Sequence, residues 1–276
     1  MKIKKLSSVK NPELETIKDN KALWNLPKTR RFGYRNLHKI NRYSLYLRSD
    51  LVLRLKSKLN NKIIKCNKCL RLVNFRKKIA KEKRKQYIDQ SYWGKPITGY
   101  GDEKAKLLMV GLAPAAHGGN RTGRVFTGDK SADFLFSCLY KTGFANQPDS
   151  VERGDGLELQ NMYLTTALKC VPPEDKPTSQ ELKTCFNFFN QEIAFLKKIK
   201  VIVALGKIGH DACVNYYKQQ YEIRNKDFIF SHGSMNILPD KKILVGSYHP
   251  SPRNVNTGRI DKSKMVKLLN SIKKLL

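Results

Sequence analysis

The chain has 276 residues, of which 54 are Lys or Arg and 23 are Asp or Glu, so its formal net charge at pH 7 is +31. No stretch approaches the roughly 20 apolar residues that a membrane-spanning helix needs. Six cysteines are too few and too irregularly spaced for a secreted disulfide scaffold. The basic start of the chain lacks the apolar segment of a signal peptide. The sequence therefore predicts a soluble, cytoplasmic protein.

The large positive charge points to the kind of partner. A compact chain with this excess of Lys and Arg repels itself, so a polyanion, and nucleic acid first of all, is the expected partner. A genome that favours Lys codons and a role at a membrane surface are the alternatives. Binding through phosphates should weaken steeply as the salt concentration rises.

The first part of the chain differs in composition from the rest. Residues 1–62 are rich in Lys and Arg and hold few acids and almost no Gly. We interpret them as a basic extension, partly disordered and with a helix around residues 49–60, which tracks a nucleic-acid backbone or serves only as a solubilising tail. A second basic run, residues 76–85, predicts one exposed helix with a solvated face. Residues 63–276 are expected to form the folded domain.

Beyond residue 100, short apolar runs alternate with helical patterns. Four runs predict buried strands, at Lys106–Gly111, Met162–Ala167, Val201–Leu205 and Ile243–Ser247. Helices are predicted at Ala132–Leu139, behind a capping box of Thr178 and Glu181, and from Ile260 to Leu276. This alternation predicts an α/β fold, a three-layer α/β/α sandwich with a central, mostly parallel four-stranded sheet.

In such a sheet the ligand site lies at the carboxyl ends of the strands. Two loops rich in Gly, Pro and polar residues follow predicted strands there, residues 111–124 after the first strand and residues 249–254 after the last. A backbone of this composition can approach a ligand closely. We therefore expect the functional site at these two loops.

Four of the six cysteines have a spacing that suits a metal centre. Cys66 and Cys69 form a C-x2-C pair, and Cys170 and Cys185 lie about a hundred residues further on. This separation disfavours a local zinc ribbon, whereas four thiolates suit an iron–sulfur cluster that ties the amino-terminal segment to the sheet. A zinc site and buried structural thiols remain alternatives, since Cys185 lies on the apolar stripe of its helix. The other two cysteines are expected in the core.

Several motifs between residues 63 and 270 are shared with one known family. They are Tyr92–Gly94, Gly111–Asp129, Lys169–Pro173, His249–Ser251 and Asn254 with Thr257–Arg259. The chain resembles uracil-DNA glycosylases, specifically the B-type or fifth family. The long motif from Gly111 is highly specific, whereas the His-Pro-Ser tripeptide alone would be weak.

The resemblance implies an activity, a cofactor and a partner. The activity is the removal of uracil from DNA in base excision repair, by base flipping and hydrolysis of the N-glycosidic bond. The cofactor is a 4Fe-4S cluster on the four cysteines of the two pairs. The partner is damaged DNA, double- or single-stranded, bound by a monomer. The extension of residues 1–62 lies outside the resemblance.

The resemblance also implies roles for individual residues. His249 would donate a hydrogen bond to a carbonyl of the base, and Phe126 would stack on the flipped base. A turn-capping histidine and a core phenylalanine are the alternatives. Gly111, Ala113 and Thr166 would line the base pocket.

Three positions, Leu112, Ala113 and Thr166, depart from other branches of the superfamily. Those branches place a polar residue for the attacking water where this chain has Leu112 and Ala113. The nearest carboxylate is Asp129, which we expect to orient water or to stabilise the cationic sugar. A cap on the next helix is the alternative. Relatives in other branches read uracil with an Asn where Thr166 stands. We therefore expect a broader range that includes hypoxanthine.

The same loops supply the expected DNA contacts. Pro252 and Arg253 are expected to wedge into the minor groove, with Asn254 at the backbone or the base edges. Further expected contacts are Asn120, Arg121, Arg124 and Arg259, although exposed arginines need no special function.

Two rival interpretations remain open at this point. One is a non-catalytic nucleic-acid-binding protein with an iron–sulfur or zinc staple. The other is an A-type glycosylase, which would carry Glu in place of Leu112.

Overall fold

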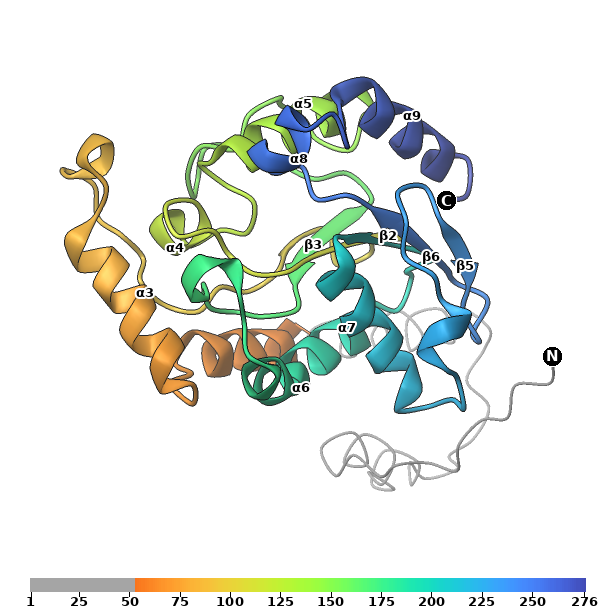
Figure 1. The fold of residues 1–276 in the computed structure, drawn as a ribbon, viewed down its shortest axis with the longest axis horizontal. Coiled ribbons are helices and arrows are strands. Elements are labelled where there is room, and N and C mark those ends of the chain that lie inside the picture. Colours follow the sequence, from red (N-terminus) through yellow and green to blue (C-terminus); the bar gives the residue numbers. More distant parts are fainter. Residues whose placement is uncertain (1–52) are drawn as a thin grey trace, which may run out of the picture.

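The computed structural model describes residues 53–276, which surround one central sheet (Figure 1). The six strands follow the order β1-β3-β2-β4-β6-β5. Their bounds are β1 Tyr100–Gly101, β2 Leu107–Gly111, β3 Met162–Thr166, β4 Val201–Leu205, β5 Met235–Ile237 and β6 Ile243–Ser247. The four inner strands run parallel, and the two edge strands pair antiparallel to their neighbours.

This sheet confirms the predicted fold class and all four predicted strands. It has two more strands than expected because the edge strands carry no apolar run. β1 has two residues and β5 has three, and the side chains of β5 are exposed or half-buried. Short and partly solvated strands of this kind give little periodicity to read.

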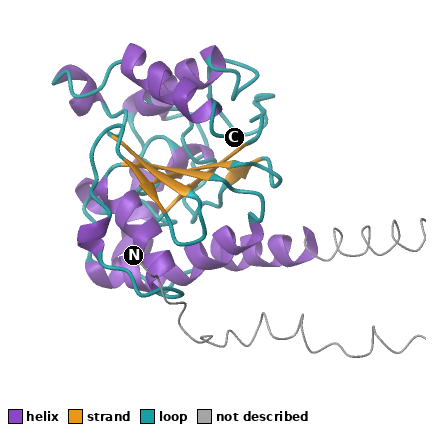
Figure 2. Ribbon diagram, turned by 90° about the vertical axis from the view of Figure 1, so that its right-hand side faces the viewer, coloured by secondary structure: helices purple, strands orange, loops and turns teal. Residues whose placement is uncertain are grey.

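Helices cover both faces of the sheet, which makes the three layers visible in Figure 2. The helix bounds are α3 Leu70–Glu82, α4 Gly119–Thr122, α5 Lys130–Lys141, α6 Ser179–Phe195, α7 Lys207–Lys218, α8 Pro252–Asn256 and α9 Lys262–Lys273. Alternate residues of each strand face opposite layers. Leu107 and Met109 pack with α5 and α9, whereas Leu108 and Val110 pack with α6 and α7. Both layers therefore have a continuous apolar core.

The remaining two cysteines lie in these cores, as predicted. Cys138 on α5 packs in one layer and Cys213 on α7 in the other, and both are fully buried.

Side-chain caps set the helix boundaries. The predicted capping box is confirmed: Glu181 N donates to Thr178 Oγ1 at 3.2 Å, and Thr178 N donates to Glu181 Oε2 at 2.8 Å. The last helix begins at Lys262 rather than at residue 260, because Asp261 caps it by accepting from Lys264 N at 2.8 Å. A side-chain cap of this kind satisfies amide groups that have no partner within the helix.

A helix over residues 53–64 packs against the body of the domain. Leu59 and Ile63 are buried, and Lys56 pairs with Glu103 at 2.5 Å and lies over the Tyr163 ring. The predicted boundary after residue 62 falls inside this helix, so the folded part begins no later than residue 53. Expectations for residues 1–52 lie outside the described part of the chain.

Between residues 53 and 276, no helix combines the length and the apolar character needed to cross a membrane.

A candidate base pocket at the carboxyl ends of the strands

Four of the predicted site residues lie near one another at the carboxyl edge of the sheet. Gly111 ends β2 and pairs in register with Thr166, which ends β3. His249 follows β6 by two residues, and its Cβ lies 3.9 Å from the position that a Cβ on Gly206 would take. The fourth residue is Phe126, whose ring lies over Gly111 and beside His249.

Phe126 forms one wall of this site. A Cβ added to Gly111 would lie 2.7 Å from Phe126 Cζ, so the ring occupies the space that any other residue at position 111 would need. The ring stacks with that of His249, with centroids 5.9 Å apart and planes 30° apart. Phe126 has a φ of 48°, a conformation that is costly for an aromatic residue. Backbone strain of this kind gathers at functional sites, and here it directs the ring over the strand end.

His249 is held by its backbone and leaves its ring available. Its carbonyl oxygen accepts from Asn254 Nδ2 at 2.8 Å, and Ser251 caps α8, which begins at Pro252. Among residues 53–276, no hydrogen-bond partner of its ring nitrogens is found. Burial lowers the pKa of His249 to about 4, so the imidazole is neutral at pH 7. A neutral ring carries one N–H that can donate to a ligand.

Asp129 is the N-cap of α5, as the alternative interpretation predicted. Its Oδ1 accepts from Ser131 N at 2.9 Å and from Ala132 N at 3.0 Å. Its Oδ2 faces Gly118, where a Cβ would come within 2.0 Å of that oxygen. Burial raises the pKa of Asp129. The capping role therefore uses one oxygen and leaves the other beside the loop that follows β2.

The structure argues against direct DNA contacts for three residues of that loop. Asn120, Arg121 and Arg124 are buried, with relative exposures of 1%, 8% and 5%. Arg124 makes a bidentate ion pair with Asp155 and donates to Thr127 Oγ1 at 2.9 Å.

Their other partners are internal as well. Asn120 Nδ2 donates to the carbonyl of Arg76 at 3.3 Å, and Arg121 donates to the carbonyls of His117 and Gly128. These contacts hold the loop in shape, and a role of these three residues in DNA binding stays a prediction that their burial disfavours.

The remaining expected DNA contacts follow His249 in the chain and lie at or near the surface. Pro252, Arg253 and Arg259 are exposed, and Asn254 is half-buried because it supports His249. Residues 252–256 form the short helix α8 rather than an open loop. Ala113 packs against the apolar cluster beside the cysteines, and its place at the base site stays a prediction.

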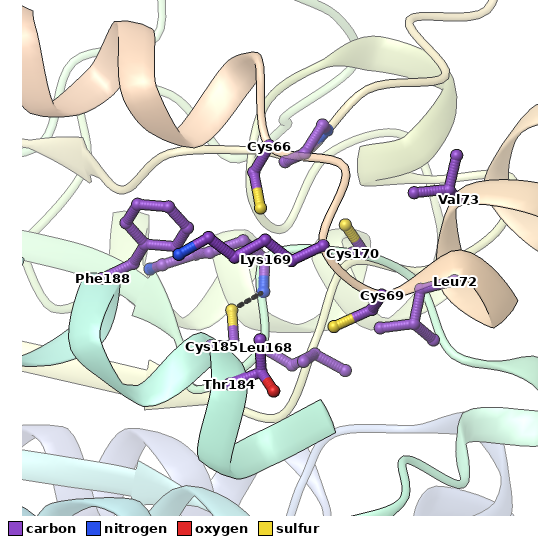
Figure 3. Close-up of a pocket in the computed structure, with 12 residues that line it drawn as sticks. Cys66, Cys69, Leu72, Val73, Leu168, Lys169, Cys170, Thr184, Cys185 and Phe188 are labelled. Carbon is purple, nitrogen blue, oxygen red and sulfur yellow. Dashed lines mark hydrogen bonds between the residues drawn. The ribbon is translucent and has the colours of Figure 1, made fainter. Parts of the chain in front are cut away.

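The four predicted ligand cysteines line one pocket, shown in Figure 3. Cys66 and Cys69 come from the segment just before α3, Cys170 follows β3, and Cys185 lies on α6. Their sulfur atoms face a common space among these elements. Among residues 53–276, no set of three or more His, Cys, Asp or Glu is placed closely enough to hold a metal ion.

The surroundings of these thiols test whether a cluster fits. Burial, with a smaller contribution from the neighbouring thiols, raises the pKa of Cys170 to about 12 and that of Cys185 to about 11. Arg76 Nη1 lies 3.5 Å from Cys170 Sγ, and Lys169 N donates to Cys185 Sγ at 3.3 Å. Arg76 Nε is buried and has no hydrogen-bond partner among the described residues. Such donors around buried sulfur suit thiolates whose charge is neutralised by bound iron.

Two polar pairs near the candidate sites were missed by sequence reasoning. Tyr92 and His117 form a hydrogen bond of 2.9 Å between Oη and Nδ1, directly before Gly118. Burial, helped by Arg84 and Arg121, lowers the pKa of His117. A histidine in a Gly-rich loop at a strand end was the available signal.

The second missed feature is a buried ion pair behind the cysteines. Lys169 Nζ lies 2.6 Å from Glu192 Oε2 and 2.6 Å from Thr165 Oγ1, and Glu192 Oε1 accepts from Gly99 N at 2.7 Å. Both charged side chains are 2% exposed. A lysine beside a cysteine in the sequence gave no sign of this partner.

Comparison with known proteins identifies the family. The model of the Uracil DNA glycosylase superfamily matches residues 98–273. A type-5 uracil-DNA glycosylase of Thermus thermophilus is 40% identical over 210 residues, covering 76% of this chain and 93% of that protein. The type-5 enzyme of Pyrobaculum aerophilum is 40% identical over 209 residues, with 76% and 88% covered.

Similarity to the other branch is lower. A type-4 uracil-DNA glycosylase of Sulfurisphaera tokodaii is 24% identical over 199 residues, covering 70% of this chain and 73% of that protein. The chain thus belongs to the uracil DNA glycosylase superfamily and, within it, to the type-5 family.

Proposed function

We propose that this protein excises uracil from DNA by extruding the nucleotide and hydrolysing its N-glycosidic bond, as a step of base excision repair. The observation that carries the proposal is the arrangement of Phe126 and His249 over Gly111 at the carboxyl edge of the sheet. An extruded base can stack on the Phe126 ring while His249 donates to its carbonyl. The type-5 relatives are named as uracil-DNA glycosylases, which supports this assignment.

His249 suits the departure of the base as an anion. Cleavage of the bond builds negative charge on the base, and a fixed N–H donor stabilises charge that develops only in the transition state. Because burial holds the pKa of His249 near 4, the ring donates from its neutral form throughout the neutral range.

Asp129 is the group available for the sugar. The reaction leaves positive charge on the sugar and needs a positioned water. One oxygen of Asp129 is fixed by the amides of α5, so the other is held in a defined direction beside Gly118. We assign Oδ2 to the orientation of that water or to stabilisation of the cationic sugar.

The proposed substrate range extends beyond uracil. Thr166 is buried at the end of β3 and lies near Gly111, with its Cγ2 3.7 Å from a Cβ built there. A hydroxyl and a methyl group read the edge of a base less strictly than a side-chain amide does. Hypoxanthine and other deaminated bases are therefore proposed as further substrates.

We also propose that Cys66, Cys69, Cys170 and Cys185 hold a 4Fe-4S cluster. The shared pocket and the donors to sulfur support it. Four thiolates from separate segments suit an iron–sulfur cluster better than a local zinc ribbon. When bound, it would cross-link the segment before α3 to the sheet and to α6.

On the DNA side, α8 and the short turn that follows it are proposed to engage the duplex. Pro252 and Arg253 would fill the gap left by the extruded nucleotide, and Arg259 would contact a phosphate. Asn254 keeps His249 in place.

The test is an excision assay on single-lesion duplexes with three variants. His249→Ala should lower the single-turnover rate on uracil by roughly 10²–10³-fold, the loss typical of one removed donor to a developing anion. Asp129→Asn keeps the helix cap, because Asn caps as well as Asp does, so any loss of rate reports chemistry.

Asp129→Ala loses the cap as well, and should also lower stability by about 1 kcal/mol. If wild-type protein with its full iron content releases no uracil, the proposed function is wrong. Release of uracil but of no other deaminated base would overturn only the broad range.

A further inference from the structure

A basic arm, defined here as residues 77–90, projects beside the candidate site. It comprises the end of α3, the turn at Lys83 and the short 3-10 turn Lys85–Tyr87 with the three residues after it. Figure 1 shows this segment protruding from the body on the side of α4. The arm carries six Lys or Arg and two acidic residues.

The cations of the arm face solvent. The side chains concerned are Lys77, Lys78, Lys81, Arg84 and Lys85, all of them exposed. Lys78 is paired with Glu82 at 3.8 Å, whereas Lys83 Nζ donates to the carbonyl of Ile88 at 2.6 Å and thereby closes the turn. Like charges gathered on one protrusion repel one another, and a polyanion would relieve that repulsion.

The arm is fixed to the loop that follows β2. The guanidinium of Arg121 lies 4.0 Å from the centroid of the Tyr87 ring, and its Nη1 donates to Gln90 Oε1 at 2.6 Å. The same guanidinium donates to the carbonyl of Gly128 at 2.8 Å, directly before Asp129. One buried arginine therefore sets the position of the arm relative to the candidate catalytic carboxylate.

We propose that the basic arm binds the phosphate backbone of the duplex that flanks the extruded nucleotide. This inference rests on the proposed function, because it takes the site beside Asp129 as the place of the lesion. Flexible lysines on a fixed support suit phosphates, which need charge but no base-specific geometry. With Asn120, Arg121 and Arg124 turned inward, the arm takes the role that the sequence suggested for that loop.

The experiment compares two triple variants of the full chain. The first replaces Lys81, Arg84 and Lys85 with Gln. The matched control replaces the exposed Lys104, Lys197 and Lys198 with Gln; these lie just before β2 and β4, at the opposite edge of the sheet. Both variants lose the same charge. Affinity is measured by fluorescence anisotropy, over a range of salt concentrations, on a duplex with one stable abasic-site analogue.

A plot of log K against log salt has a negative slope, and the arm variant should make that slope less steep by about 2–3. Each lost phosphate contact contributes roughly 0.9 to the steepness. When the salt is raised from about 50 to 200 mM, the fold-loss of affinity should be roughly 40 times smaller for the arm variant than for the wild type. The control variant should keep the wild-type slope. Far-UV circular dichroism checks that both variants are folded.

An unchanged slope in the arm variant, or an equal loss in both variants, would overturn the proposal. Binding to the analogue needs no catalysis, so this outcome is separable from the proposed function. A weaker salt dependence in the arm variant, together with a wild type that releases no base, would leave the arm assignment standing and remove the activity.

Discussion

Replacing Arg124 with Met would remove one partner of a buried ion pair. Its two terminal nitrogens lie 2.8 and 2.6 Å from the carboxylate oxygens of Asp155, and the two side chains are 5% and 11% exposed. The same guanidinium donates to Ser150 Oγ at 3.0 Å and to Thr127 Oγ1 at 2.9 Å. The substitution therefore leaves a carboxylate and two hydroxyls without their donor, close to Phe126.

Removal of one partner of a buried pair costs about 3–5 kcal/mol. Asp155 keeps three backbone N–H donors, from residues 151, 152 and 157, so we expect the lower half of that range. For a domain of this size, 1 kcal/mol shifts Tm by about 2–4 °C. The expected loss is thus roughly 6–16 °C, measured by thermal unfolding at pH 7.

The pH dependence gives a second check on the same pair. Burial alone would raise the pKa of Asp155, but the hydrogen bonds from Arg124 and the backbone amides outweigh it and hold that pKa below its usual value. A carboxylate with a lowered pKa stabilises the fold above its unfolded pKa of about 3.9 and loses that contribution as the pH falls. The difference in Tm between wild type and Arg124→Met should therefore shrink below about pH 4.

The matched control is Arg253→Met, which changes an exposed arginine. An isolated surface substitution should change stability by no more than about 0.5 kcal/mol, but this one should weaken DNA binding. The opposite pattern would refute the reasoning. If Arg124→Met kept the wild-type Tm and lowered the salt slope of DNA binding by about 1, Arg124 would be a phosphate contact after all.

Three further predictions concern the site. Burial lowers the pKa of His249 from 6.5 to about 4. The folded state should therefore be most stable above about pH 6.5 and lose stability as the pH falls toward 4, because only the unfolded chain takes up the proton in that range. A His249→Gln variant should lack this decline when thermal unfolding is measured as a function of pH. Cys170→Ser should remove the brown colour, the absorbance near roughly 400 nm and the bound iron; full iron content in that variant would contradict the cluster assignment. Thr166→Asn should favour uracil over hypoxanthine by roughly tenfold or more in single-turnover excision, and an unchanged ratio would show that position 166 does not read the base.

Much of the sheet could be predicted from apolar runs. β4 and β6 have the predicted bounds, because each is a five-residue run buried on both faces. The edge strand β5 could not be found in this way, since its side chains are exposed or half-buried. Its pairing depends on β6, which lies several residues further along the chain.

The candidate site was predictable where residues lie at strand ends, and less so where charge suggested exposure. Gly111 and His249 follow apolar runs, so their place at one edge follows from a parallel sheet. Arg124 was expected at the surface because arginine usually lies there. Its burial depends on Asp155, 31 residues away, and no local pattern reveals that pair.

The contact between Gly111 and Phe126 links the identities of two distant positions. The aromatic ring fills the volume into which a side chain at position 111 would grow. A chain that exchanged this glycine for even an alanine would have to shrink or redirect the ring, and would give up its stacking platform for the base. Substitutions at positions 111 and 126 should consequently be tolerated only as a pair. In a library that varies both positions, the functional variants with a larger residue at position 111 should carry a smaller one at position 126.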